Sequence, residues 1–103
     1  MFSRNMPLEA NMMWIKDFVA RFSAEFKYMY EFYQSFGIMS KARMKNALEE
    51  AKSAGKSMTK AKKLEAIQRF KDALEEYENA WLLLDEALSS LNQEAKRERY
   101  LTS

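Results

Sequence analysis

Cysteine and histidine are both missing from this 103-residue chain. Without cysteine, the chain has no disulfide, no thiol nucleophile and no zinc–thiolate site. Without histidine, it lacks the commonest general base and the commonest ligand for transition metals. The acidic pairs that do occur are like charges one helical turn apart, typical of solvated surface: Asp72 with Glu76, and Glu94 with Glu98. We therefore expect a protein that is not an enzyme and that carries no metal or cofactor.

Glycine and proline are also scarce. The chain has two glycines and one proline, and so it has few positions that end a helix or make a turn. Hydrophobic residues make up 48% of it and charged residues 31%, the balance of a folded protein rather than a disordered one. This length and composition predict a single domain over residues 1–103 with a modest core.

Long apolar runs are the third absence. The longest, residues 80–84, is far shorter than a membrane-spanning segment. No continuous apolar segment follows Arg4, so the sequence shows no signal peptide. We expect a cytoplasmic protein, with secretion independent of a cleaved signal as the alternative.

What the chain does have is two stretches in which apolar residues recur at alternating spacings of four and three. Each holds the pattern for about four heptads, which predicts a long helix with one apolar face. The first series is Leu8, Met12, Ile15, Val19, Phe22, Phe26, Met29, Tyr33 and Phe36, and the second is Ile67, Phe70, Leu74, Tyr77, Trp81, Leu84, Leu88, Leu91 and Ala95. Alanines at 66, 73, 80 and 87 flank the second series, so another helix can approach closely there. The sequence therefore predicts an all-α protein with heptad packing like that of a coiled coil.

The two glycines divide the chain into three predicted helices. Gly37 and Gly55 both suit the left-handed position that ends helices. Ser40 is a suitable N-cap for the second helix, and Ser57 or Thr59 for the third. The predicted helices cover residues 7–36, 40–54 and 59–99, with frayed ends at 1–6 and 100–103.

Two arrangements fit these helices. At 1.5 Å per residue they are roughly 45, 20 and 60 Å long, so the first two laid end to end match the third. One arrangement is a long antiparallel helical hairpin, with its first arm kinked near Gly37 and a turn near residues 55–59. The other is a three-helix bundle, in which the second helix folds back at Gly37.

The first predicted helix is more apolar than one packed face requires. Nine of the fourteen aromatic residues lie between Trp14 and Phe36. A hairpin covers only one stripe of such a helix, and a large exposed aromatic patch usually marks an interface. We expect this surface to bind a protein partner or a second copy of the chain, with cover by the second helix as the alternative. The candidate partner-binding residues are Trp14, Phe18, Tyr28, Tyr30 and Phe32.

Charge is segregated along the chain, although the net charge is only +2. Residues 41–71 carry ten basic and three acidic side chains, whereas residues 72–103 carry three basic and eight acidic ones. The predicted boundaries place Lys60, Lys62 and Lys63 in the first turn of the third helix, where the helix dipole disfavours cations. Free backbone N–H groups at a helix start, together with lysines, can hold phosphate or carboxylate. The candidate contacts for an acidic partner are Lys52, Lys56, Lys60, Lys62 and Lys63, with a plain solvated surface as the simpler interpretation.

Together these features predict a small non-catalytic helical protein that binds other proteins, as adaptors, chaperones and inhibitors do. Self-association through the aromatic face is part of the prediction, and neither a membrane nor a small-molecule substrate is expected. One alternative is a nucleic-acid-binding accessory protein that uses the basic segment 41–71. Against it, residues 41–69 include no aromatic side chain for stacking on bases. The other alternative is a structural subunit of a coiled-coil assembly.

Overall fold

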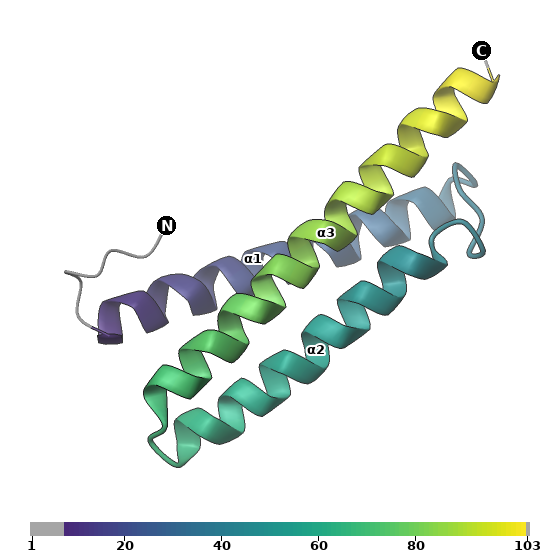
Figure 1. The fold of residues 1–103 in the computed structure, drawn as a ribbon. Coiled ribbons are helices and arrows are strands. Elements are labelled where there is room, and N and C mark those ends of the chain that lie inside the picture. The colour runs from purple at the N-terminus through teal and green to yellow at the C-terminus, as the bar shows by residue number, and fades with distance from the viewer. Residues whose placement is uncertain (1–7, 103) are drawn as a thin grey trace.

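Three α-helices make up the regular structure of residues 8–102, the part of the chain that this computed structural model describes (Figure 1). They are α1 (Leu8–Ser35), α2 (Lys45–Ala66) and α3 (Phe70–Thr102). Helices α2 and α3 run antiparallel side by side, and α1 crosses α3, with which it makes most of its contacts. The predicted all-α fold class is confirmed. Within the described residues, no helix combines the length and the apolar composition needed to cross a membrane.

Helix α1 ends next to a glycine in the left-handed conformation, as predicted. Gly37 has a φ of 66°, and the N–H groups of Gly37 and Ile38 donate to the carbonyls of Gln34 and Tyr33 at 3.2 and 2.9 Å. These two bonds are the Schellman pattern, which satisfies the last carbonyls of a helix. The chain then reverses, so that α2 runs back beside α3 instead of extending α1 (Figure 1). Of the two predicted arrangements, the structure has the three-helix one.

The second helix begins later than predicted, at Lys45 rather than at residue 40. Ser40 acts one turn earlier, because its Oγ accepts a hydrogen bond from the Arg43 N–H at 3.3 Å in a turn that leads into α2. Met44 occupies the N-cap position itself and makes no side-chain capping bond. Ser40, predicted as the N-cap of the second helix, therefore belongs to the turn that precedes α2.

The prediction that Gly55 ends the second helix is wrong. Helix α2 continues through Gly55 to Ala66, and the predicted caps of the third helix, Ser57 and Thr59, lie inside it. The Thr59 hydroxyl donates to the Gly55 carbonyl at 3.0 Å, one turn back along the helix. A glycine weakens a helix by about 1 kcal/mol relative to alanine but does not end it. Whether the helix continues is decided by what it packs against.

Packing on α3 holds α2 together across this glycine. Both helices bury alanines at seven-residue intervals: Ala47, Ala54 and Ala61 in α2, and Ala73, Ala80 and Ala87 in α3. The helices are in antiparallel register, because the Asn79 amide donates to the Ser57 hydroxyl at 2.9 Å and Lys60 pairs with Glu76 at 3.2 Å. Ala54 and Ala61 of α2 share one core cluster with Ala73 and Ala80 of α3. Small side chains on both helices let their backbones approach closely. The sequence predicted this for α3, from the alanines that flank the second apolar series.

The turn between α2 and α3 forms at a glutamine. Gln68 has a φ of 62°, and the N–H groups of Gln68 and Arg69 donate to the carbonyls of Glu65 and Leu64 at 3.0 and 2.9 Å. This repeats the Schellman pattern of Gly37, although the left-handed conformation costs a residue with a Cβ roughly 1–2 kcal/mol. The predicted turn at residues 55–59 is therefore wrong by about ten positions.

The third helix is displaced accordingly at both ends. It begins at Phe70 rather than at residue 59, and it reaches Thr102 rather than residue 99. Residues 100–102, predicted as frayed, are thus part of α3. The predicted frayed segment 1–6 and the predicted first helical residue, Pro7, lie outside the described residues.

The inner face of α1 meets the α2–α3 hairpin in two core clusters. One contains Ile15, Val19, Tyr77 and Leu84, and the other contains Phe26, Met44, Leu88 and Leu91. Phe22 packs against both. Both predicted apolar series contribute to these clusters, except that Phe36, Ile67 and Phe70 at helix ends stay exposed. Since the core lies on one side of α1, the other side is left open.

Candidate functional site

The outer face of α1 carries aromatic side chains that the rest of the described chain does not cover. The exposed fraction is 53% for Trp14, 70% for Tyr28 and 39% for Phe32, and Met13 and Phe36 are also exposed, at 72% and 71%. Helix α2, the alternative cover for this surface, packs along α3 instead. The other described residues therefore leave open the aromatic surface that the sequence predicts on the first helix.

Two of the five candidate partner-binding residues are half-buried. Phe18 packs against Trp14 and against Trp81 of α3, with ring centroids 6.1 Å apart in both pairs. It therefore connects the exposed Trp14 to the core. Tyr30 stacks on Phe26 at 5.9 Å and packs against the second core cluster. The structure thus separates Tyr30 from the other four candidates.

The other four belong to a second series with alternating spacings of four and three, outside the buried face of α1. We call this series the outer seam, and its members are Trp14, Phe18, Arg21, Glu25, Tyr28 and Phe32. This spacing places all six along one line of the helix. Arg21 and Glu25 are not among the residues predicted for this site, although they continue the same spacing. Aromatic residues occupy the two ends of the outer seam, and charged residues occupy its middle.

The N-terminal end of the outer seam is hollow. Met13, Trp14, Asp17, Phe18 and Arg21 line an open depression of about 480 Å³. Arg21 makes an ion pair with Asp17 at 3.0 Å, which places polar groups along one edge of the depression. Aromatic walls with a polar edge are the composition of a protein interface.

At the C-terminal end of the outer seam, aromatic rings contact one another in a continuous row. Tyr28 stacks on Phe32 with ring centroids 6.4 Å apart, and Phe32 contacts Phe36 at 4.8 Å. Phe32 also meets Tyr33 edge to face at 5.8 Å. These intrahelical contacts restrict the side-chain rotamers before any partner arrives, which lowers the conformational entropy lost on binding.

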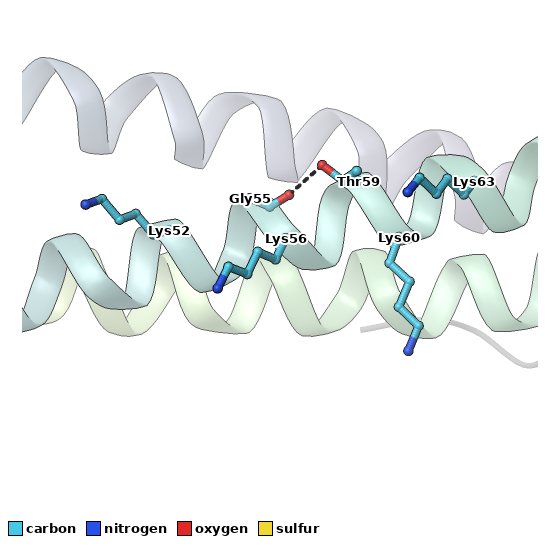
Figure 2. Close-up of a pocket in the computed structure, with 6 residues that line it drawn as sticks. All are labelled: Lys52, Gly55, Lys56, Thr59, Lys60 and Lys63. Carbon is cyan, nitrogen blue, oxygen red and sulfur yellow. Dashed lines mark hydrogen bonds between the residues drawn. The ribbon is translucent and has the colours of Figure 1, made fainter.

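Four of the five candidate lysines line up on the outer face of α2 (Figure 2). Lys52, Lys56, Lys60 and Lys63 line, with Gly55 and Thr59, an open depression of about 560 Å³. We call these four residues the lysine ridge. Lys60 makes an ion pair with Glu76 of α3 at 3.2 Å. The fifth candidate, Lys62, is exposed but does not line the depression.

The lysines do not stand at the start of a helix, and that prediction is wrong. Lys60, Lys62 and Lys63 lie in the C-terminal half of α2, and Lys63 stands in its last turn, where the helix dipole favours cations. The free backbone N–H groups of a helix start are therefore not beside them. An acidic ligand on this surface would be held by lysine side chains alone.

A polar network joins the three helices to one another. Lys16 of α1 donates to one carboxylate oxygen of Glu65 in α2, and the hydroxyl of Tyr77 in α3 donates to the other at 2.9 Å. The hydrogen bond from Lys16 first, and that from Tyr77 in addition, hold the pKa of Glu65 below its ordinary value, although burial opposes this. Burial, followed by the bond to Glu65, raises the pKa of Tyr77 to about 12. We assign the network to fixing the position at which α1 crosses the hairpin.

Another carboxyl with a shifted pKa lies between α2 and α3. Burial first, and the neighbouring Glu86 second, raise the pKa of Glu50, which accepts a hydrogen bond from Ser90 at 3.3 Å. Glu50 lines neither of the two depressions described above. Among the side chains that the structure describes, no cluster of three or more acidic residues is placed to hold a metal ion.

No protein family matches this chain, and comparisons with curated proteins and with solved structures give no match. The surfaces of α1 and α2 are therefore the basis for assigning a function. The outer seam combines exposed aromatic rings with a charged centre, whereas the lysine ridge offers charge alone.

Proposed function

We propose that this protein is a small, non-catalytic interaction module that binds a protein partner through the outer seam of α1. The observation that carries this proposal is the exposure of Trp14, Tyr28 and Phe32, which the packing of the three helices leaves uncovered. Large aromatic side chains aligned on one helix form an apolar surface that is unfavourable in water. A partner helix laid along the outer seam removes that surface from water.

The residue types of the outer seam support the same proposal. Trp, Tyr and Arg supply a large share of the binding energy in protein interfaces, and Trp14, Arg21 and Tyr28 all lie in the seam. The depression beside Trp14 is open to a partner side chain, and Met13 at its edge can adapt to the shape that enters. Adaptors, chaperones and small inhibitors act through surfaces of this kind, in the cytoplasm that the sequence leads us to expect.

A triple variant tests the proposal: Trp14→Gln, Tyr28→Gln and Phe32→Gln together. We expect circular dichroism to show unchanged helix content, because none of these side chains belongs to a core cluster. We expect the variant to lose association, measured by sedimentation of the purified protein and by pull-down from the source cell. The matched control carries Ile67→Gln and Leu82→Gln, which replace exposed apolar residues outside the outer seam.

The control should associate as the wild type does. Equal association by the triple variant and the wild type would refute the proposal, and so would unfolding of the triple variant, since its residues would then belong to the core. Sedimentation also tests the structural alternative, because an open-ended assembly gives masses far above that of a small complex.

The lysine ridge favours a second candidate function, binding to nucleic acid. Its four lysines extend over roughly 16 Å along one face of α2 and can contact backbone phosphates. No aromatic residue of α2 accompanies them, so such binding would be independent of base sequence. A gel shift with duplex and single strands, repeated at rising salt, tests this function. We expect any complex to weaken with salt and with glutamine at all four ridge positions, and no shift at low salt would remove this candidate.

A further inference from the structure

The outer seam has the same chemical order from either end. Two aromatic residues begin it, two opposite charges occupy its centre, and two aromatic residues end it: Trp14, Phe18, Arg21, Glu25, Tyr28 and Phe32. The spacings also read the same in both directions, as four, three, four, three and four. A surface with this symmetry is complementary to itself, which is what a two-fold symmetric dimer requires.

When two such seams align antiparallel, each aromatic residue lies opposite an aromatic residue and each charge lies opposite a charge of the other sign. With a two-fold axis at position 23, the opposed pairs are Trp14 with Phe32 of the second copy, Phe18 with Tyr28, and Arg21 with Glu25. Residues at alternating spacings of four and three interdigitate between paired helices in just this way. The overlap runs over residues 11–35, which is roughly 37 Å of helix and nearly all of α1.

The central charges select the antiparallel direction. Each Arg21 meets a Glu25 of the second copy when the helices run in opposite directions. A parallel, in-register pair would instead bring Arg21 against Arg21 and Glu25 against Glu25, which is repulsive. Among the described residues, Glu25 makes no hydrogen bond or ion pair, and the one ion pair of Arg21 is with Asp17, at 3.0 Å. A carboxylate without a partner among the described residues therefore stands where the second copy would supply a guanidinium.

We propose that the outer seam of α1 binds the same seam of a second copy of this chain, antiparallel and two-fold symmetric about position 23. This inference rests on the proposed function and names the partner of that surface. The two Arg21–Glu25 pairs fix the register at the centre of the interface. The aromatic residues at the two ends supply most of the buried apolar surface.

Charge reversal tests the register. Arg21→Glu and Glu25→Arg each replace two attractive contacts in the dimer by two repulsive ones, so each should raise the dimer dissociation constant at least about tenfold. The combined variant exchanges the two charges and should restore the constant to within about threefold of the wild type. Sedimentation equilibrium measures all four proteins, with circular dichroism as the control for folding. Failure of the combined variant to recover would overturn the inference.

Single cysteines test the direction, because the chain has none of its own. Arg21→Cys and Glu25→Cys are prepared separately and then mixed under oxidising conditions. Antiparallel pairing predicts a disulfide-linked dimer that forms in the mixture much faster than in either preparation alone, since only unlike positions face each other. Faster linkage within one preparation would show a parallel pair and overturn the inference.

The two proposals fail in different ways. A wild-type protein that stays monomeric up to about 1 mM would overturn the dimer. If the monomeric wild type still bound another protein, and the triple variant did not, the proposed function would stand with that protein as the partner. A triple variant of Trp14, Tyr28 and Phe32 that associates as the wild type does would overturn both proposals.

Discussion

The two glycines of this protein occupy opposite backbone environments, and the same substitution should therefore act on them in opposite directions. Gly55 lies in the interior of α2, whereas Gly37 holds a left-handed φ of 66° after α1. Gly55→Ala should raise the free energy of unfolding. Gly37→Ala should lower it.

The magnitudes follow from the backbone alone. A Cβ added at either glycine would meet no heavy atom within 4 Å, so no clash or new contact complicates the comparison. Alanine in a helix interior is more stable than glycine by about 1 kcal/mol, and alanine in the left-handed region is less stable by about 1–2 kcal/mol. The two variants should therefore differ by about 2–3 kcal/mol. For a domain of this size, each 1 kcal/mol corresponds to a shift of about 4–8 °C in Tm.

Urea unfolding followed by circular dichroism measures both variants, and calorimetry provides an independent Tm. The pair is its own control, because the chemical change is identical at the two sites. A Gly55→Ala variant less stable than the wild type would contradict a continuous α2, since it would mean that the helix breaks there. An unchanged Gly37→Ala variant would contradict the left-handed end of α1.

Three further predictions concern the second turn, the polar network and the alanine interface. Gln68→Gly should raise the free energy of unfolding by about 1 kcal/mol, because glycine adopts the left-handed φ without strain. Gln68→Ala should leave the free energy of unfolding nearly unchanged, since alanine carries the same Cβ. Urea unfolding measures both variants, and equal effects would count against a left-handed turn at this position. Folding raises the pKa of Tyr77 from 10 to about 12. The stability linked to this shift is fully present below pH 10 and is lost as the pH rises to about 12. Over that range the wild type should lose about 2–3 kcal/mol more stability than Tyr77→Phe, and equal losses in alkaline unfolding would argue against the buried bond to Glu65. Ala80→Leu should destabilise the protein by roughly 1–3 kcal/mol, because Ala80 is fully buried in the core cluster that also contains Ala54 and Ala61 of α2. Wild-type stability in the thermal melt would show that α2 and α3 are not closely packed there.

The two apolar series were the part of the fold most directly readable in the sequence. They predicted two long helices, and their members such as Ile15, Tyr77 and Leu91 fill the core. The end of α1 at Gly37 was readable too, since a single glycine there follows the last apolar position. Helical periodicity and a left-handed end are local properties, and local sequence carries them.

The boundary between the last two helices was not readable, because its signals point to the wrong residues. Gly55 suggested a turn but sits in a helix, and Gln68 makes the turn without the residue type that usually does so. Glycine permits the left-handed conformation without requiring it. The heptad alanines of α2 were the signal that could have corrected this, since Ala47, Ala54 and Ala61 run straight through Gly55.

For the candidate site, the sequence named the aromatic residues, and the structure decided which of them share a surface. Tyr30 turned out to pack against the second core cluster, whereas Arg21 and Glu25 join the outer seam. The segregation of charge along the sequence identified the lysines. The sequence placed them at the start of a helix, where the dipole disfavours cations, but the structure places them toward the C-terminal end of α2.

The sequence by itself determined that this protein is helical, where its apolar faces lie and that its first helix is unusually aromatic. Only the tertiary structure decided that α2 folds back, that it runs unbroken to Ala66, and that the outer seam of α1 stays open. The physical reason is that spacing along a helix sets which side chains share a face. Which of those faces is buried depends on the neighbours that long-range packing supplies.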